Sequence, residues 1–247
     1  MISFDITKNV IEFLSEEERG AVIKKRVESQ IRVGSIEEAF KTISLLDIDD
    51  PSRAELYQKI GLAVHNRIYS TTSDTAFATF SKIKILPQNA MRHICVTDFF
   101  SHIYRFNQTL ALTIPNELDP LKDRVSLGAI AIQLARDGNH ERAVEIALSI
   151  LRDPYLQRWG LKFDRDYYLL EIARNYLKDE SISFDKIANT LSLIENSPSR
   201  DGVLLDFVRV LLRANRVDEA ISWASQISDT YYKEDAKKLL ESYKLLG

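Results

Sequence analysis

One stretch of the sequence runs Gly138-Asn139-His140-Glu141-Arg142-Ala143-Val144-Glu145-Ile146-Ala147-Leu148-Ser149-Ile150, and Pro154 follows it. Ala143, Ala147 and Ile150 stand at offsets zero, four and seven, so a helix would place them on one face. Gly138 suits the left-handed residue that ends a preceding helix. The stretch therefore predicts a turn followed by an amphipathic helix.

The same pattern recurs along the chain. Its first apolar position, which we call the anchor, is occupied in turn by Ala39, Ala76, Leu110, Ala143, Ile187 and Ala220. Apolar residues follow four and seven positions later, except in the third copy, where Glu117 breaks the last position. Corners between helices are expected near Gly34, Ser73, Asn107, Gly138, Ser181 and Asn215.

Five of the six prolines follow an anchor at similar distances, where a second helix is expected to stop. Another segment of helical period precedes each corner. These segments are Ala21–Val33, Ala54–Ser70, Asn89–Arg105, Asp123–Arg136, Asp166–Leu177 and Gly202–Arg213. Each repeat is thus predicted to be a helical hairpin that buries its apolar face against the next.

The predicted fold is all-α, an α-solenoid of about six stacked antiparallel hairpins in a single domain, residues 1–247. The repeats are expected at about 21–51, 54–87, 89–120, 123–154, 166–198 and 202–228. Ile2–Glu18 and Asp229–Leu246 have amphipathic patterns that suit capping helices at the two ends of the array, residues 1–19 and 229–247.

These motifs resemble a divergent array of tetratricopeptide-type repeats. Ala76-x3-Phe80…Pro87 matches the tail of that repeat best, and Ala39-x3-Ile43…Pro51 comes next. The family's Trp-x2-Leu-Gly-x2-Tyr motif is missing from every copy, and Leu127-Gly128 is the nearest approach. The resemblance implies a right-handed superhelix. Another α-solenoid of similar period is the alternative, and the extra segment Tyr155–Phe163 departs from the family.

Composition and charge argue against several classes of protein. The net charge of −3 and pI near 5.9 give no support to a general nucleic-acid or membrane-surface binder. With Cys95 as the sole cysteine, no internal disulfide can form. Residues 1–18 lack a basic segment followed by an apolar core, and no apolar run is long enough to span a membrane, so we expect a cytoplasmic protein.

No catalytic, cofactor or metal motif stands out in the sequence. Cys95 lies among apolar neighbours and is expected to be a buried small hydrophobe, and His93-x-Cys95 has the wrong spacing for two metal ligands on one helical face. The pairs Glu37-Glu38 and Asp49-Asp50 are explained by helix capping and the helix dipole. We therefore expect no enzyme activity and no cofactor.

The resemblance also implies where a partner would bind, because the first helices of such hairpins face the groove of the family. When the register of the family is applied to this sequence from the anchors, it gives candidate residues for binding a protein or peptide. They are Lys24, Glu28, Arg32, His65, Tyr69, Arg92, Phe99, His102, Arg136, Arg209 and Arg213. Arginines in this set could grip carboxylates of a peptide, although cations also suit helix C-termini in general.

The main hypothesis is a non-enzymatic scaffold or adaptor that binds a protein or peptide, with its oligomeric state open. The alternative is a helical-repeat enzyme or secreted effector with a site in the irregular 155–166 insertion, near Trp159, Lys162, Asp164 and Asp166. An RNA-binding repeat protein is a third possibility, against which the acidic pI argues.

Overall fold

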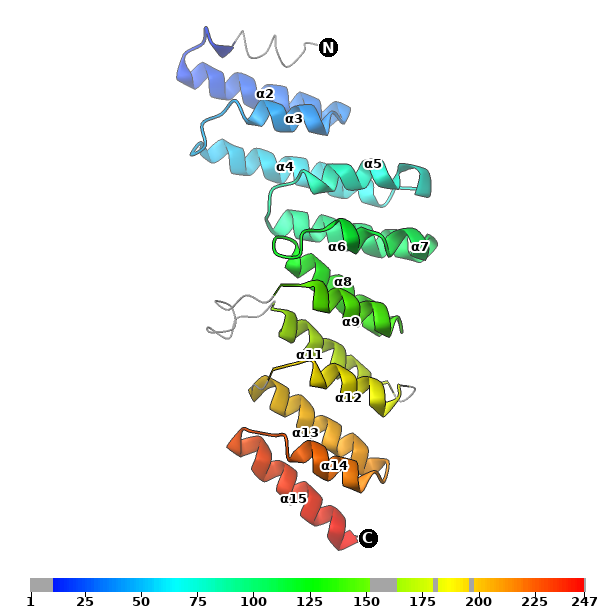
Figure 1. The fold of residues 1–247 in the computed structure, drawn as a ribbon. Coiled ribbons are helices and arrows are strands. Elements are labelled where there is room, and N and C mark those ends of the chain that lie inside the picture. The colour runs from blue at the N-terminus through cyan, green and yellow to red at the C-terminus, as the bar shows by residue number, and fades with distance from the viewer. Residues whose placement is uncertain (1–10, 152–163, 180–181, 196–197, 247) are drawn as a thin grey trace. The chain divides into compact units, whose positions relative to one another are not determined.

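The computed structural model describes residues 11–151, 164–179, 182–195 and 198–246, and over these residues the chain is α-helical with one 3₁₀ turn and no strand (Figure 1). This agrees with the predicted all-α class. The chain divides into two compact units, unit 1 (Met1–Glu117) and unit 2 (Leu118–Gly247). The boundary falls at Glu117, the position that breaks the third copy of the repeat.

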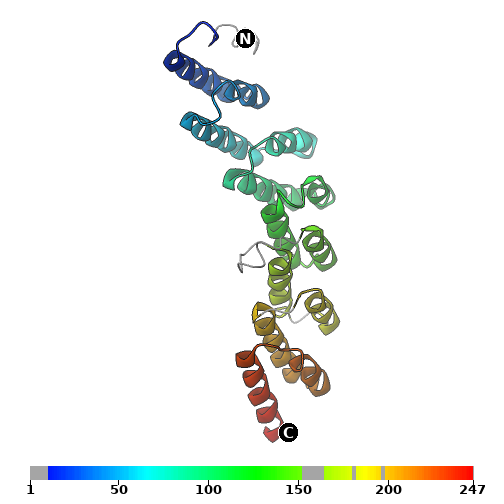
Figure 2. The same cartoon turned by 60° about the vertical axis from the view of Figure 1, so that its left-hand side comes forward.

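The described residues of unit 1 form three helical hairpins, and in each we call the first helix the A helix and the second the B helix. The pairs are α2 (Glu16–Val33) with α3 (Ile36–Ile43), α4 (Pro51–Ile68) with α5 (Ser73–Lys84), and α6 (Ala90–Phe106) with α7 (Gln108–Ala111). The A helices contact one another in order, α2 against α4 and α4 against α6. In Figure 2, α5 and α7 lie together on one side of α4 and α6.

Unit 2 repeats the arrangement over its described residues. Its helices are α8 (Arg124–Arg136) with α9 (His140–Ser149), α11 (Arg165–Tyr176) with α12 (Phe184–Ser192), α13 (Pro198–Arg213) with α14 (Val217–Ala224), and α15 (Thr230–Leu246). Here α11 packs on α8, α13 on α11 and α15 on α13. The helix predicted at Asp229–Leu246 is therefore present, whereas Tyr155–Phe163 lies outside the described residues.

The left-handed conformation expected at Gly138 is present there and at two other predicted corners. Gly34, Gly138 and Asn215 have φ values of 80°, 81° and 59°, in the left-handed region. The residue after each corner donates a backbone hydrogen bond five residues back, at 2.8–2.9 Å. This 6→1 bond is typical of a Schellman motif, which satisfies a carbonyl at the end of the A helix.

The predicted apolar spine is buried. Five of the six anchors are less than 3% exposed, and Leu110 is half-buried. The positions four residues after the anchors are all buried, and they are Ile43, Phe80, Ile114, Ala147, Leu191 and Ala224. Ala at an anchor lets the B helix approach its A helix closely, and the branched side chains then fill the space between successive hairpins.

The third hairpin is shorter than the repeat predicts. Asn107 begins α7, and its side chain accepts a hydrogen bond from the Leu110 amide at 3.0 Å. The helix lasts for a single turn and is followed by a 3₁₀ turn, η1 (Ile114–Glu117). Pro115 explains the break, because proline in a helix interior lacks the donor for an i→i−4 bond and clashes with the preceding turn.

The capping helix predicted over Ile2–Glu18 is wrong in one respect, because the chain does not continue as a single helix up to Glu18. Residues 12–15 form a turn, and Ser15 caps α2, which begins at Glu16. Ser15 and Glu18 form a capping box in which the Ser15 amide donates to Glu18 Oε2 at 3.0 Å. The acidic run therefore opens a helix, as the positive end of the helix dipole favours.

Two prolines begin A helices, so their role differs from the stop signal that we predicted. Pro51 is the first residue of α4, after Asp50, whose Oδ1 accepts from the Ser52 amide at 2.8 Å. Pro198 is the first residue of α13. Proline is favoured at this position because its fixed φ suits a helix and its missing donor would have no partner there.

Arginine side chains tie successive hairpins together. Arg53 of α4, Arg92 of α6 and Arg200 of α13 each donate to a carbonyl at the end of the preceding B helix or just beyond it. Arg92 Nη1 reaches Leu86 O at 3.1 Å and also bonds Ile83 O and Lys84 O. We call this feature the arginine clasp, and it adds a side-chain donor to carbonyls at or just beyond the end of the B helix, where helical backbone donors run out.

Candidate functional site

Exposed and half-exposed polar and aromatic side chains cross the three A helices of unit 1. We call this set the A-helix surface. It comprises Lys24, Glu28 and Arg32 on α2, Glu55, Lys59, His65 and Tyr69 on or at the end of α4, and Asp98, His102 and Phe106 on α6. Six of the eleven residues predicted from the sequence belong to it, and ion pairs, hydrogen bonds or ring contacts link five of these to neighbouring members of the surface.

The first part of the surface is a charged tetrad. Lys24 Nζ lies 3.1 Å from Glu55 Oε2, and Lys59 Nζ lies 2.7 Å from Glu28 Oε1 and 2.9 Å from Glu55 Oε1. The hydrogen bond from Lys59 lowers the pKa of Glu28, and the same bond raises the pKa of Lys59. Two cations face two carboxylates, so the tetrad is neutral as a whole.

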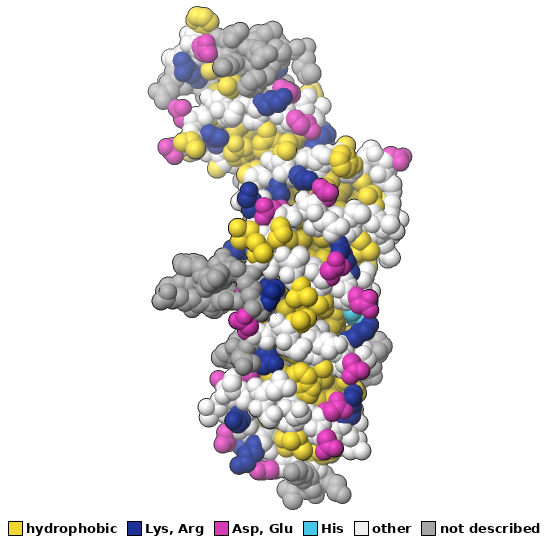
Figure 3. Space-filling view, in the orientation of Figure 1, with side chains coloured by type: hydrophobic (Ala, Val, Ile, Leu, Met, Phe, Trp, Pro, Cys, Tyr) yellow, Lys and Arg dark blue, Asp and Glu magenta, His cyan; other side chains and the backbone are white. Residues whose placement is uncertain are grey.

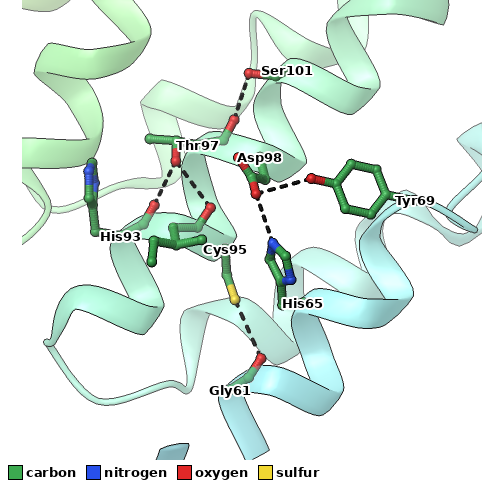
Figure 4. Close-up of polar contacts among 9 residues, drawn as sticks. Gly61, His65, Tyr69, His93, Cys95, Thr97, Asp98 and Ser101 are labelled. Atoms are coloured by element: carbon green, nitrogen blue, oxygen red, sulfur yellow. Dashed lines mark hydrogen bonds and ion pairs between the residues drawn. The ribbon is translucent and has the colours of Figure 1, made fainter.

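The second part is a shared carboxylate on α6 (Figure 4). Asp98 Oδ2 lies 2.8 Å from His65 Nε2 and accepts a hydrogen bond from the Tyr69 hydroxyl at 3.1 Å. The hydrogen bond to Asp98 raises the pKa of Tyr69, because it stabilises the protonated phenol. Both contacts use the same oxygen, and no described residue donates a hydrogen bond to Asp98 Oδ1.

The third part is a run of four aromatic rings that we call the ring ladder. His65 and Tyr69 meet edge to face with centroids 5.8 Å apart, as do Tyr69 and His102 at 5.8 Å and His102 and Phe106 at 5.2 Å. Tyr69 is 58% exposed and Phe106 is 48% exposed. His102 Nε2 is held 3.0 Å from Thr71 O. The ladder therefore offers anchored rings to solvent.

Helical spacing explains why these groups meet. Asp98, His102 and Phe106 follow one another at intervals of four on α6, and His65 and Tyr69 do so at the end of α4. Residues four apart share a helix face, and the packing of α4 on α6 brings the two rows together.

Two predicted site residues are buried and do not belong to the surface. Phe99 is 1% exposed and stacks on Phe80 with centroids 5.5 Å apart, so it is part of the core. Arg92 is 7% exposed and forms the arginine clasp on α5. The register of the repeat family predicted that both side chains face a groove, and this is wrong. Phe99 instead contacts Phe80 of the preceding B helix, and Arg92 contacts the carbonyls at the end of that helix.

The remaining predicted residues lie in unit 2 and are exposed. Arg136 is in the last turn of α8, Arg213 is in the last turn of α13, and Arg209 pairs with Asp206 at 2.7 Å within α13. The last-turn placement also holds for Arg32, and it agrees with the favourable position of a cation at a helix C-terminus.

The opposite side of the hairpins has a different character. In Figure 3, which views the B helices from the front, hydrophobic patches alternate with charged and other side chains. Exposed apolar residues on the B helices include Phe77 of unit 1, which is 81% exposed, and Ile221 of unit 2, which is 41% exposed.

Cys95, shown in Figure 4, is not placed for nucleophilic chemistry. Its side chain is fully buried, it lies 3.6 Å from Gly61 O, and burial raises its pKa to about 12. A reactive thiol needs a lowered pKa and access to solvent. This agrees with the predicted role of a buried small hydrophobe.

The described part of the 155–166 insertion has structural contacts. Asp164 is buried, and Asp166 Oδ2 accepts a hydrogen bond from the Glu195 amide at 3.2 Å. Trp159 and Lys162 lie outside the described residues. Among those described, no group of three or more His, Cys, Asp or Glu residues could hold a metal ion. A surface hollow of about 550 Å³ opens between α14 and α15, and its lining includes no residue of the insertion.

Sequence reasoning missed four members of the surface, Glu55, Lys59, Asp98 and Phe106. Spacing alone could have found Asp98 and Phe106, since both stand four residues from the predicted His102. Glu55 and Lys59 are also four apart and face the predicted Lys24 and Glu28 across the α2–α4 interface.

Among the described residues, no helix combines the length and apolar character needed to cross a membrane. No family model, curated protein sequence or solved structure matches the chain.

Proposed function

We propose that the protein is a non-enzymatic scaffold that binds a protein or peptide on the A-helix surface of unit 1. We also propose that the hairpins of both units continue as one right-handed solenoid of tetratricopeptide-like repeats. It rests on the repeat, on the buried anchors and on the surface contacts described above.

One observation carries the functional part. Lys24, Glu28, His65, Tyr69 and His102, which were selected by the register of the family, all take part in contacts between A helices. One group of contacts joins α2 to α4 and the other joins α4 to α6. An extended peptide can cross such a surface and meet first the charged tetrad and then the ring ladder. Aromatic residues are enriched at protein interfaces because they bury a large area with little loss of conformational entropy.

The contacts within the surface also favour binding over chemistry. The side chains hold one another in place, so a partner would meet a largely preformed site and lose less free energy to ordering it. Cys95 is buried with a raised pKa, which leaves the neighbouring His65–Asp98 pair without a thiolate to activate.

The experiment is affinity capture with quantitative crosslinking, in which the full-length wild type is compared with two variants in lysate of the source cells. Tyr69→Ala with His102→Ala removes the centre of the ring ladder, and Phe77→Ala removes an exposed ring from α5 as a matched control. We expect partners to be retained by the control and reduced at least tenfold by the double variant, provided that circular dichroism shows equal folding.

Equal recovery with the double variant and the wild type would contradict the proposal, as would loss with Phe77→Ala alone. The second result would point to the B-helix side. Mapping of the crosslinked sites decides between the two sides independently of the variants.

A further inference from the structure

Charge is distributed unevenly over the A-helix surface. The tetrad of Lys24, Glu28, Glu55 and Lys59 neutralises itself. Asp98 bonds a histidine and a phenol, neither of which carries a fixed positive charge, and its Oδ1 receives no hydrogen bond from a described residue. Asp98 therefore has the capacity to bind a further donor, and unlike Glu28 and Glu55 it forms no ion pair with a described lysine or arginine.

The aromatic rings next to Asp98 point to the same kind of ligand. Tyr69 shares the Asp98 oxygen with His65 and stands at the centre of the ring ladder. The face of an aromatic ring attracts a cation through its quadrupole, and this attraction adds to that of a nearby carboxylate. Tyr69 and Phe106 are about half exposed, so a partner can reach them.

We propose that Asp98 and the ring ladder form a subsite for one cationic side chain, arginine or lysine, of the bound peptide. The proposal rests on the proposed function and adds the chemistry of the partner. The ammonium or guanidinium group donates to Asp98 Oδ1 while its aliphatic stem packs along Tyr69 and Phe106. Arginine is the better fit, because its planar group stacks on aromatic rings as well as donating hydrogen bonds.

Other side chains fit this place less well. An anionic side chain would meet the Asp98 carboxylate as a like charge. A purely apolar side chain would cover Asp98 without giving its free oxygen a hydrogen bond, which costs free energy when a charged group is removed from water. Arg105, in the last turn of α6, acts electrostatically on Tyr69.

The test uses a positional-scanning library of immobilised nonapeptides with free termini blocked, probed with the purified full chain. Each pool fixes one amino acid at one position. The wild type should bind pools with fixed arginine or lysine about fivefold to tenfold more strongly than pools with fixed aspartate or glutamate, from one cation–π contact and one ion pair. Asp98→Asn should reduce this ratio to about one, because asparagine keeps the size of the side chain and one acceptor oxygen without the charge.

Asp74→Asn is the matched control, since Asp74 is an exposed aspartate in the first turn of α5 in the same unit. It should leave the preference unchanged. Tyr69→Phe keeps the ring and should retain most of the preference, whereas Tyr69→Ala should remove it.

The outcomes separate this inference from the proposed function. Strong binding to pools without a cationic preference, or a preference that survives Asp98→Asn, overturns the subsite and leaves the binding function standing. Binding to no pool at all, together with failure of the capture experiment, overturns both.

Discussion

The packing of α8 against α11 predicts a large effect of adding one methyl group. Gly128 lies in α8, and a Cβ built there would be 2.0 Å from Cε1 and Cζ of Tyr168 in α11. Carbon atoms in contact normally stay about 3.5–4.0 Å apart, so the ring would have to move by about 1.5 Å or more. Tyr168 is 2% exposed and its helix packs on α8, α9, α12 and α13, so the ring has little room to move.

Two opposed contributions decide how much Gly128→Ala changes the free energy of unfolding. Gly→Ala inside a helix stabilises by about 1 kcal/mol through helix propensity, whereas overpacking a core costs about 1–3 kcal/mol or more. The overlap is severe and involves a rigid ring, so we expect Gly128→Ala to lower the free energy of unfolding by about 2 kcal/mol. With a urea m-value of about 1–3 kcal/mol per molar, the unfolding midpoint should fall by about 1 M.

Two other glycines supply matched controls. Gly20 lies in α2 with no atom within 4 Å of its built Cβ, so Gly20→Ala should raise stability by about 0.5–1 kcal/mol. A Cβ at Gly61 would meet Met91 Cγ at 2.2 Å, but the flexible methionine can change rotamer, so Gly61→Ala should stay within about 1 kcal/mol of the wild type.

Urea unfolding followed by far-UV circular dichroism measures the series. Tyr168→Leu as a second change should reduce the cost of Gly128→Ala by at least about 1 kcal/mol in a double-mutant cycle, because the leucine leaves room for the methyl group. Two results would refute the close approach of α8 and α11. One is a Gly128→Ala protein as stable as the Gly20→Ala protein, and the other is a double variant in which the free-energy effects of Gly128→Ala and Tyr168→Leu simply add.

Three further predictions concern single side chains. Cys95, with a pKa of about 12, should resist maleimide at pH 8 in the folded protein and react at once in 6 M guanidinium; fast labelling of the native chain would contradict its burial. Arg92→Lys should lower the free energy of unfolding by about 1–3 kcal/mol, measured by urea titration, because a lysine cannot serve the same three carbonyls; an unchanged midpoint would show that the clasp is dispensable. Ser15→Ala should destabilise α2 more at pH 7 than at pH 3, because the Ser15 hydroxyl donates to Glu18 Oε2 at 2.6 Å and lowers the pKa of Glu18 below its ordinary 4.5. This part of the stabilisation is present above that value and disappears as the pH falls through the folded pKa, so equal effects on the unfolding midpoint at pH 7 and pH 3 would be inconsistent with it.

The sequence predicted those parts of the fold that depend on local chemistry. Gly34, Gly138 and Asn215 were expected at corners because a left-handed residue is needed there, and the structure has them in that conformation. Buried anchors such as Ala39 and Ala220 were expected from period alone. Both features require only the residue and its neighbours along the chain.

Features that depend on distant partners were harder to predict. The register assigned Phe99 to a surface, but only the position of Phe80 on another helix shows that it is core. Arg92 has the spacing of a surface residue, and its burial is explained by the carbonyls that end α5. Asp98 was overlooked because its role depends on His65 and Tyr69 of the neighbouring hairpin. Whether the two units form one array remains a prediction of the repeat.

The arginine clasp has a consequence for how such a chain can be shortened or recombined. Arg92 of one hairpin completes the end of α5 in the hairpin before it, so a cut between α5 and α6 would expose carbonyls that the upstream fragment cannot satisfy. The transferable unit is therefore a B helix together with the A helix that follows it, and it is best joined at the corners between A and B helices. Grafts joined at Gly34 and Ser73 would carry α3, α4 and the Arg53 clasp as an intact insert.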